Sequence, residues 1–199
     1  MIKLRVVLAG ILSGIVLFLW LSVAHMALPL GMTGISQIPT EQPVVDAMRA
    51  NIPQPGLYLI PGPGAAFNGP QSPERQAARR DYEARYSAGP VGLLIYHPVG
   101  GPMMNASQLI AELLNNVLQG LALAMILALL ASHTIRAGAY VGFAAGICAA
   151  TATNVSYWNW YGFPASYTAA AIVTEIVGYI LMGVAGGWLL GRLARRQGA

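Results

Sequence analysis

Four long, almost unbroken apolar stretches dominate the pattern of hydrophobic and polar positions along this chain. They cover residues 6–28, 109–131, 137–157 and 169–190. A helix of about 20 apolar residues is long enough to cross about 30 Å of hydrocarbon. The pattern therefore predicts an all-α membrane protein, built as a bundle of four transmembrane helices.

The segment between the first and second stretches has a different pattern. Residues 43–51 and 73–86 have the composition of short helices, and the second of these is rich in charges of both signs. Residues 57–60 and 91–96 are short apolar runs between glycines and prolines, a pattern typical of strands. The two strands can pair antiparallel, so we expect a small α/β insertion here.

The chain is therefore expected to fall into three parts. Residues 1–28 form an N-terminal transmembrane helix, and residues 29–105 form an outer, periplasmic insertion between helices 1 and 2 of the bundle. Residues 106–199 hold the other three helices and a cytoplasmic tail. We expect the first helix to be retained as an anchor, because His25-Met26-Ala27 is a poor small-x-small cleavage site.

Composition supports the membrane class. Hydrophobic residues make up 56% of the chain and charged residues 9%, whereas a soluble domain carries about a quarter charged residues. The single cysteine, Cys148, lies within the third apolar stretch and cannot form an intrachain disulfide.

The basic residues gather at the ends of the apolar stretches. No acid accompanies those at the two chain ends and in the link between the second and third stretches, which are Lys3, Arg5, Arg136, Arg192, Arg195 and Arg196. In the segment 29–105, by contrast, the arginines and the acids balance. Positive charge near helix ends marks the cytoplasmic side. We therefore expect both termini in the cytoplasm of a bacterial inner-membrane protein, and no nucleic-acid partner.

Polar side chains interrupt the apolar stretches at a few positions. Four of them follow helical spacing along one face of the second stretch: Glu112, Asn115, Asn116 and Gln119. Glu175 in the fourth stretch lies at a similar expected depth, with both acids within about 10 Å of the outer edge at 1.5 Å per residue. Asn154 in the third stretch completes a candidate intramembrane polar site.

Two interpretations of this polar site are open. Intramembrane acids are costly and often functional, and two close carboxylates can share a proton, so the residues can form a proton- or cation-handling site. Alternatively, they form a hydrogen-bonded polar plug that fixes how the helices meet.

Glycines recur at a spacing of four in three of the stretches. These candidate packing residues are Gly10, Gly14, Gly138, Gly142, Gly146, Gly183, Gly187 and Gly191. Small residues at this spacing let helix backbones approach closely. They pack either within the bundle or against other membrane subunits.

Aromatic residues and histidines gather near the outer ends of the helices. Trp158, Trp160, Tyr161 and Phe163 form an aromatic turn that is typical of a membrane–water interface, with a partner- or lipid-binding surface as the alternative. His25 and His97 are weak candidate metal ligands, because their spacing matches no metal motif. We expect no cofactor.

Two segments carry a resemblance to a known group of proteins. These are GLLIYHPVG before the second helix and YWNWYGFP before the fourth. Together with the layout of one anchor, a large outer insertion and three closely linked helices, the chain resembles uncharacterised bacterial four-helix inner-membrane proteins. The resemblance implies a four-helix fold and no established activity.

The sequence lacks a catalytic motif, so we expect a protein that is not an enzyme. Our leading hypothesis is an integral membrane accessory subunit that packs with other membrane proteins or with copies of itself in the lipid bilayer. The first alternative is a small proton- or cation-coupled permeation protein that uses Glu112 and Glu175. The second is a membrane enzyme with an outer His/Glu site.

Overall fold

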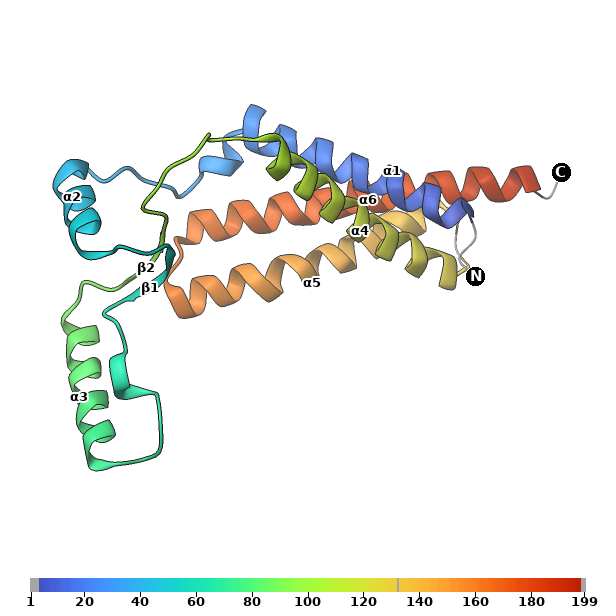
Figure 1. The fold of residues 1–199 in the computed structure, drawn as a ribbon. Helices are drawn as coiled ribbons and strands as arrows, with labels where there is room; N and C mark the ends of the chain where they lie inside the picture. Colours follow the sequence, from blue (N-terminus) through green and yellow to red (C-terminus); the bar gives the residue numbers. More distant parts are fainter. Residues whose placement is uncertain (1–3, 132, 198–199) are drawn as a thin grey trace. The chain divides into compact units, whose positions relative to one another are not determined.

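The computed structural model describes residues 4–131 and 133–197. These form two compact units (Figure 1). One unit contains the long helices and comprises Met1–Ile35 and Met103–Ala199, and the other comprises Ser36–Pro102. We call them the helical unit and the insertion.

Four helices of the helical unit are long and apolar enough to cross a membrane, as the hydropathy pattern predicted. They are α1 (Leu4–Ser22), which continues as a π-helical turn η1 (Val23–Ala27), α4 (Ala106–Leu129), α5 (Ile135–Tyr161) and α6 (Ala165–Gln197). The expected α-helical membrane architecture is therefore confirmed.

Helices α5 and α6 extend beyond their expected ends. Helix α5 runs to Tyr161, where Gly162 adopts the left-handed conformation with φ 72° and ends it. Helix α6 begins at Ala165 and continues to Gln197 through the arginines that were expected to form a tail. Arg195 and Arg196 suit a helical C-terminus, because cations interact favourably with the negative end of the helix dipole.

Side-chain caps fix where α4 and α5 begin. Asn105 accepts a hydrogen bond from the backbone N–H of Gln108, and the Gln108 side chain accepts one from the N–H of Asn105, which makes a capping box. Thr134 caps α5 by accepting from the N–H of Ala137. These polar side chains satisfy backbone N–H groups in the first turn and thereby fix the residue at which each helix begins.

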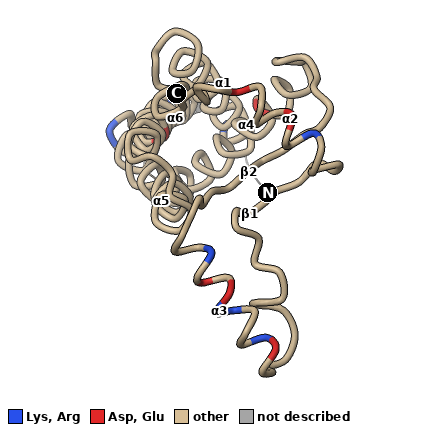
Figure 2. The backbone as a smooth tube through the Cα atoms, turned by 90° about the vertical axis from the view of Figure 1, so that its left-hand side faces the viewer, with Lys and Arg blue, Asp and Glu red and all other residues tan. Residues whose placement is uncertain are grey.

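The helices pack as two close pairs, α1 with α4 and α5 with α6, and α1 also packs along α6. Helices α4 and α5 make few contacts with each other. The tube view of Figure 2 follows the same backbone and shows how few charged residues the long helices carry in comparison with α3 (Pro73–Ala88). A buried apolar core that includes Leu17, Leu123, Leu127 and Met182 joins the two pairs.

The glycines lie where these pairs meet. A Cβ atom at Gly10 would lie 2.7 Å from the Cα of Leu121 on α4, and one at Gly14 would overlap the backbone of Val117. Between α5 and α6, Gly138 and Gly183 face each other, and Gly142 faces the backbone of Tyr179. All eight glycines singled out from the sequence meet a neighbouring segment of the same chain.

After η1 the chain stays with the helical unit for a further few residues. A 3₁₀ turn, η2 (Pro29–Met32), packs near α6. Gly34, with φ 80°, has no room for a side chain, because a Cβ atom there would lie 2.7 Å from the backbone nitrogen of Tyr167.

The insertion contains α2 (Glu41–Asn51), β1 (Gly56–Ile60), a short turn η3 (Gly64–Ala66), α3 and β2 (Gly92–Tyr96). The two strands pair antiparallel, with Leu57 opposite Ile95. The expected hairpin and both short helices are therefore present.

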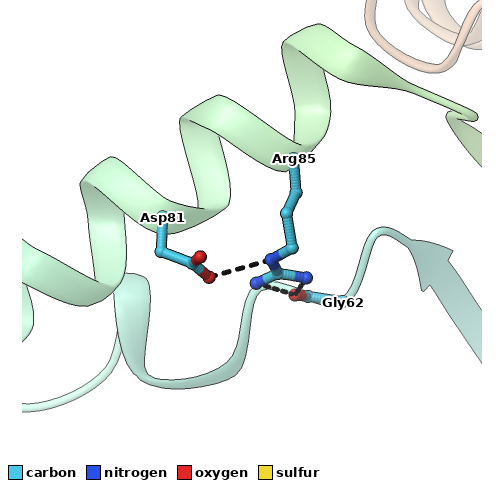
Figure 3. Close-up of polar contacts among 3 residues, drawn as sticks. All are labelled: Gly62, Asp81 and Arg85. Atoms are coloured by element: carbon cyan, nitrogen blue, oxygen red, sulfur yellow. Dashed lines mark hydrogen bonds and ion pairs between the residues drawn. The ribbon is translucent and has the colours of Figure 1, made fainter.

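Ion pairs and a cap stabilise α3 within the insertion. Ser72 accepts a hydrogen bond from the N–H of Arg75 at the start of the helix. Near its end, the Nε of Arg85 lies 2.8 Å from a carboxylate oxygen of Asp81, and both terminal nitrogens of Arg85 donate to the carbonyl of Gly62 (Figure 3). Arg85 thereby ties the helix to the segment that follows β1.

Candidate functional site

A polar cavity of about 410 Å³ lies between α4 and α5 in the helical unit. We call it the lateral cavity. All four long helices contribute to its lining, which consists of Leu17, Leu21, Glu112, Asn116, Gln119, Ala149, Ala152, Thr153, Glu175 and Tyr179. Glu112, Ala152 and Thr153 are exposed. The cavity therefore opens between two helices that scarcely touch.

The α4 wall carries three of the four polar residues found by spacing. Glu112, Asn116 and Gln119 border the cavity, because positions i, i+4 and i+7 share one helix face. Asn115 is exposed and does not line the cavity.

The α6 wall carries Glu175 and, one turn further on, Tyr179. The Tyr179 hydroxyl lies 2.8 Å from Oε1 of Gln119 and donates a hydrogen bond to it across the cavity. This bond links α4 to α6 at the base of the polar lining. Tyr179 was missed in the sequence, although its spacing of four from Glu175 is a signal that could have identified it.

Asn154 of α5 holds the Glu175 side chain. Its Nδ2 donates to Oε1 of Glu175 at 3.0 Å and to the carbonyl of Ala150 at 2.9 Å. Asn154 is buried, whereas Glu175 is half-buried. The carboxylate is thus held by one side-chain hydrogen bond and keeps acceptor capacity for another group.

Asn116 differs from Asn154, because its side chain makes no hydrogen bond with the described residues. Its side chain is fully buried, at 0% exposure, yet neither its Oδ1 nor its Nδ2 has a hydrogen-bond partner among the described residues. A buried amide without partners carries a desolvation cost.

The two acids lie at different depths along their helices. At a rise of 1.5 Å per residue, Glu112 lies about 9 Å from the start of α4 and Glu175 about 15 Å from the start of α6. The longer α6 places Glu175 deeper than the sequence count suggested, and close to the level of Asn116. Both acids nevertheless border the same cavity.

A second cavity, of about 240 Å³, lies on the other side of Glu175. We call it the His25 cavity. It is lined by His25, Leu30, Gly31, Ile35, Asn154, Tyr167, Ala171, Thr174 and Glu175. His25 shares a hydrogen bond of 2.9 Å through Nδ1 with the carbonyl of Leu21, which leaves its Nε2 available. Glu175 is the one ionisable residue that borders both cavities.

Among the residues that the structure describes, no Lys or Arg lines either cavity, while the lateral cavity has two acids. In the described part of the chain, no group of three or more His, Cys, Asp and Glu residues is arranged to hold a metal ion. Of the weak metal candidates, His25 belongs to the helical unit and His97 to the insertion.

The candidate interface aromatics lie at the end of α5 and in the link to α6. Trp158, Trp160 and Tyr161 are exposed. Phe163 is half-buried and stacks on Tyr157 at a ring separation of 5.2 Å. The exposed indoles are free to contact lipid or another protein.

No protein-family model, curated protein or solved structure matches this chain.

Proposed function

We propose that this protein is an accessory subunit of a larger membrane complex, and that it packs a transmembrane helix of a partner protein into the lateral cavity between α4 and α5. The observation that carries this proposal is the cavity itself. It combines polar side chains with an opening between two helices of the membrane-spanning region.

The physical reason is the cost of polar groups in hydrocarbon. Ionisable residues within membrane spans normally face a bundle interior or water and pair with other groups. Glu112 is exposed, and Asn116 has no partner among the described residues. A partner helix that fills the opening would remove Glu112 from lipid.

The lining also indicates the chemistry of the partner. Two carboxylates line the cavity, and among the residues that the structure describes no Lys or Arg lines it. A partner helix that carries a lysine or arginine at this depth would therefore be complementary in charge. The glycine faces offer no comparable site, because they are already occupied by helices of the same chain.

The proposal includes an orientation and a compartment. The distribution of arginines favours both termini in the cytoplasm, and the proposed compartment is the inner membrane of a bacterium. In that orientation, the lateral cavity lies in the half of the bilayer that is closer to the periplasm.

Site-specific photo-crosslinking in membranes tests the proposal. A photoreactive amino acid at Thr153, on the rim of the cavity, should capture a second membrane protein. The matched control is Leu114, an exposed residue of α4 outside the lining. Native mass spectrometry after gentle extraction should show the same heteromeric complex. Thr153→Trp, which fills the opening, should release the partner, and Leu114→Trp should retain it. Equal capture from both positions would contradict the proposal.

One observation favours a second candidate function, a small proton- or cation-coupled permeation protein. Glu175 borders both the lateral cavity and the His25 cavity, so a proton or cation could pass between them at this carboxylate. Beyond the lateral cavity, however, Leu123, Leu127 and Met182 are packed in the buried core. A continuous path would require these residues to separate.

A flux measurement decides between the two candidates. The purified chain in liposomes with a trapped pH-sensitive dye should give no proton flux above that of empty liposomes if it is an accessory subunit. Flux that disappears in Glu175→Gln would instead establish permeation.

A further inference from the structure

A third cavity, of about 290 Å³, lies at the opposite end of the helical unit, where α5 begins and α6 ends. We call it the basic cavity. It is lined by His133, Thr134, Ile135, Arg136, Gly187, Trp188, Gly191 and Arg195. None of these residues contributes to the lateral cavity or the His25 cavity.

The lining is positively charged. Arg136 comes from the first turn of α5 and Arg195 from the last turns of α6, so two separate helices direct basic residues to one place. In the described ranges 4–131 and 133–197, no acid lines the cavity. The ion pairs among the described residues all lie in the insertion, so neither arginine is neutralised by a carboxylate of this chain.

The start of α5 adds backbone donors. Thr134 accepts from the N–H of Ala137, and its carbonyl accepts from the N–H of Gly138. The N–H groups of Ile135 and Arg136 precede these positions and have no acceptor within the helix. Free N–H groups and the positive end of a helix dipole together favour an anion.

His133 adds a buried ring nitrogen to the lining of the cavity. Its Nε2 is buried and has no hydrogen-bond partner among the described residues. The His133 carbonyl packs against Gly191, which holds the residue beside α6. His133 lines the cavity, so a rotation of its ring would bring this nitrogen to an anion there.

Trp188 indicates that the cavity faces lipid headgroups. It lines the cavity, it is 41% exposed, and the guanidinium of Arg192 lies 5.4 Å from its ring centre. Tryptophan is enriched at membrane–water interfaces. Gly187 and Gly191 line the same wall, and both pack against backbone carbonyls at the start of α5, those of Thr134 and His133.

We propose that the basic cavity binds the phosphate of an anionic phospholipid headgroup. The arginines, His133 and the first N–H groups of α5 are the donors, and the lipid's acyl chains lie along the exposed apolar surface beside Trp188. Basic pockets between membrane helices are suited to anionic headgroups. This site is independent of the lateral cavity and of the accessory-subunit proposal.

Native mass spectrometry of the full-length protein, released from nanodiscs that contain equal amounts of phosphatidylglycerol and phosphatidylcholine, tests the proposal. We expect retained lipid to be mainly phosphatidylglycerol. Arg136→Gln and Arg195→Gln should each reduce that preference about fivefold. The matched control is Arg196→Gln, since Arg196 neighbours Arg195 but does not line the cavity. It should leave the preference unchanged.

A second measurement needs no variant. Phosphatidylglycerol should raise the unfolding temperature of the wild-type chain in detergent more than phosphatidylcholine does. Inorganic phosphate should have a smaller effect, because it lacks the acyl chains. Equal retention of both lipids, an equal loss in the Arg196 control, or a phosphate effect as large as that of the lipid would each overturn the proposal.

Discussion

Two buried asparagines of the helical unit differ in a way that can be measured. Asn154 donates to Glu175 and to the carbonyl of Ala150. Asn116 is equally buried but has no hydrogen-bond partner among the described residues. The amide of Asn154 therefore contributes to the stability of the isolated chain, whereas the amide of Asn116 only adds a desolvation cost.

We predict that Asn154→Leu destabilises the purified protein by about 0.5–2 kcal/mol, the usual value of an interhelical hydrogen bond in a membrane protein. Asn116→Leu should leave the unfolding temperature of the isolated chain unchanged or raise it. Thermal unfolding of both variants in the same detergent makes the comparison. An equal loss of stability would mean that Asn116 is hydrogen-bonded within the chain.

A second residue-scale prediction concerns pH and the start of α3. The backbone N–H of Glu74 and then the hydroxyl of Ser72 hold the pKa of the Glu74 carboxyl below its ordinary value of 4.5. Because the pKa is lower in the folded state, the stabilisation is present above pH 4.5 and is lost as the pH falls through the lower folded value.

Hydrogen–deuterium exchange of the full-length protein checks this prediction. After correction for the intrinsic rate, exchange in the first turn of α3 should rise as the carboxyl becomes protonated. In Glu74→Gln this acid-induced increase should be absent, because the side chain can no longer titrate. The same rise in the variant would show that another group is responsible.

Residue spacing predicted part of the polar site. Glu112, Asn116 and Gln119 line one wall of the lateral cavity because their spacing follows the helix repeat, which is a local property. The bonds from Asn154 to Glu175 and from Tyr179 to Gln119 depend on how α5 and α6 rotate against their neighbours. A single sequence does not specify that rotation.

At the scale of the helices, the glycine contacts predict which substitutions separate them. A Cβ atom at Gly187 would overlap the carbonyl of Thr134 and lie 3.3 Å from the Cα of Gly138. Gly187→Leu should therefore force α6 away from the start of α5 and reduce folded protein severely. Ala144→Leu, at an exposed position of α5, adds a larger side chain without a clash and should be tolerated. Yield and unfolding temperature of the two variants provide the test.

The elements themselves were largely predictable, because apolar length identifies membrane spans and glycine–proline boundaries identify strands. The ends of α5 and α6 were less so. Aromatic residues near Trp158 suit both a helix and a loop, and only the left-handed Gly162 decides where α5 stops. The sequence also did not specify which helices pack together, because any glycine face could pack against any other.

At the scale of the whole molecule, the arginine distribution predicts the topology. Reporter fusions after Arg136 and after Arg196 should be cytoplasmic, and a fusion near Asn68 in the insertion should be periplasmic. Active alkaline phosphatase only at Asn68, with fluorescent protein folding only at the other two positions, is the expected result. A periplasmic signal after Arg196 would reverse the orientation.

The pairing of the helices also has a consequence for biosynthesis. Helix α1 packs against α4 and α6, but residues 28–105 separate it from α4 in the chain. At 5–20 residues per second, the ribosome needs roughly 4–16 s to make that segment. During this time α1 waits in the bilayer with its Gly10 and Gly14 groove uncovered. Since α6 joins α5 to α1 and is made after both, the nascent protein should stay sensitive to membrane proteases until α6 has been inserted.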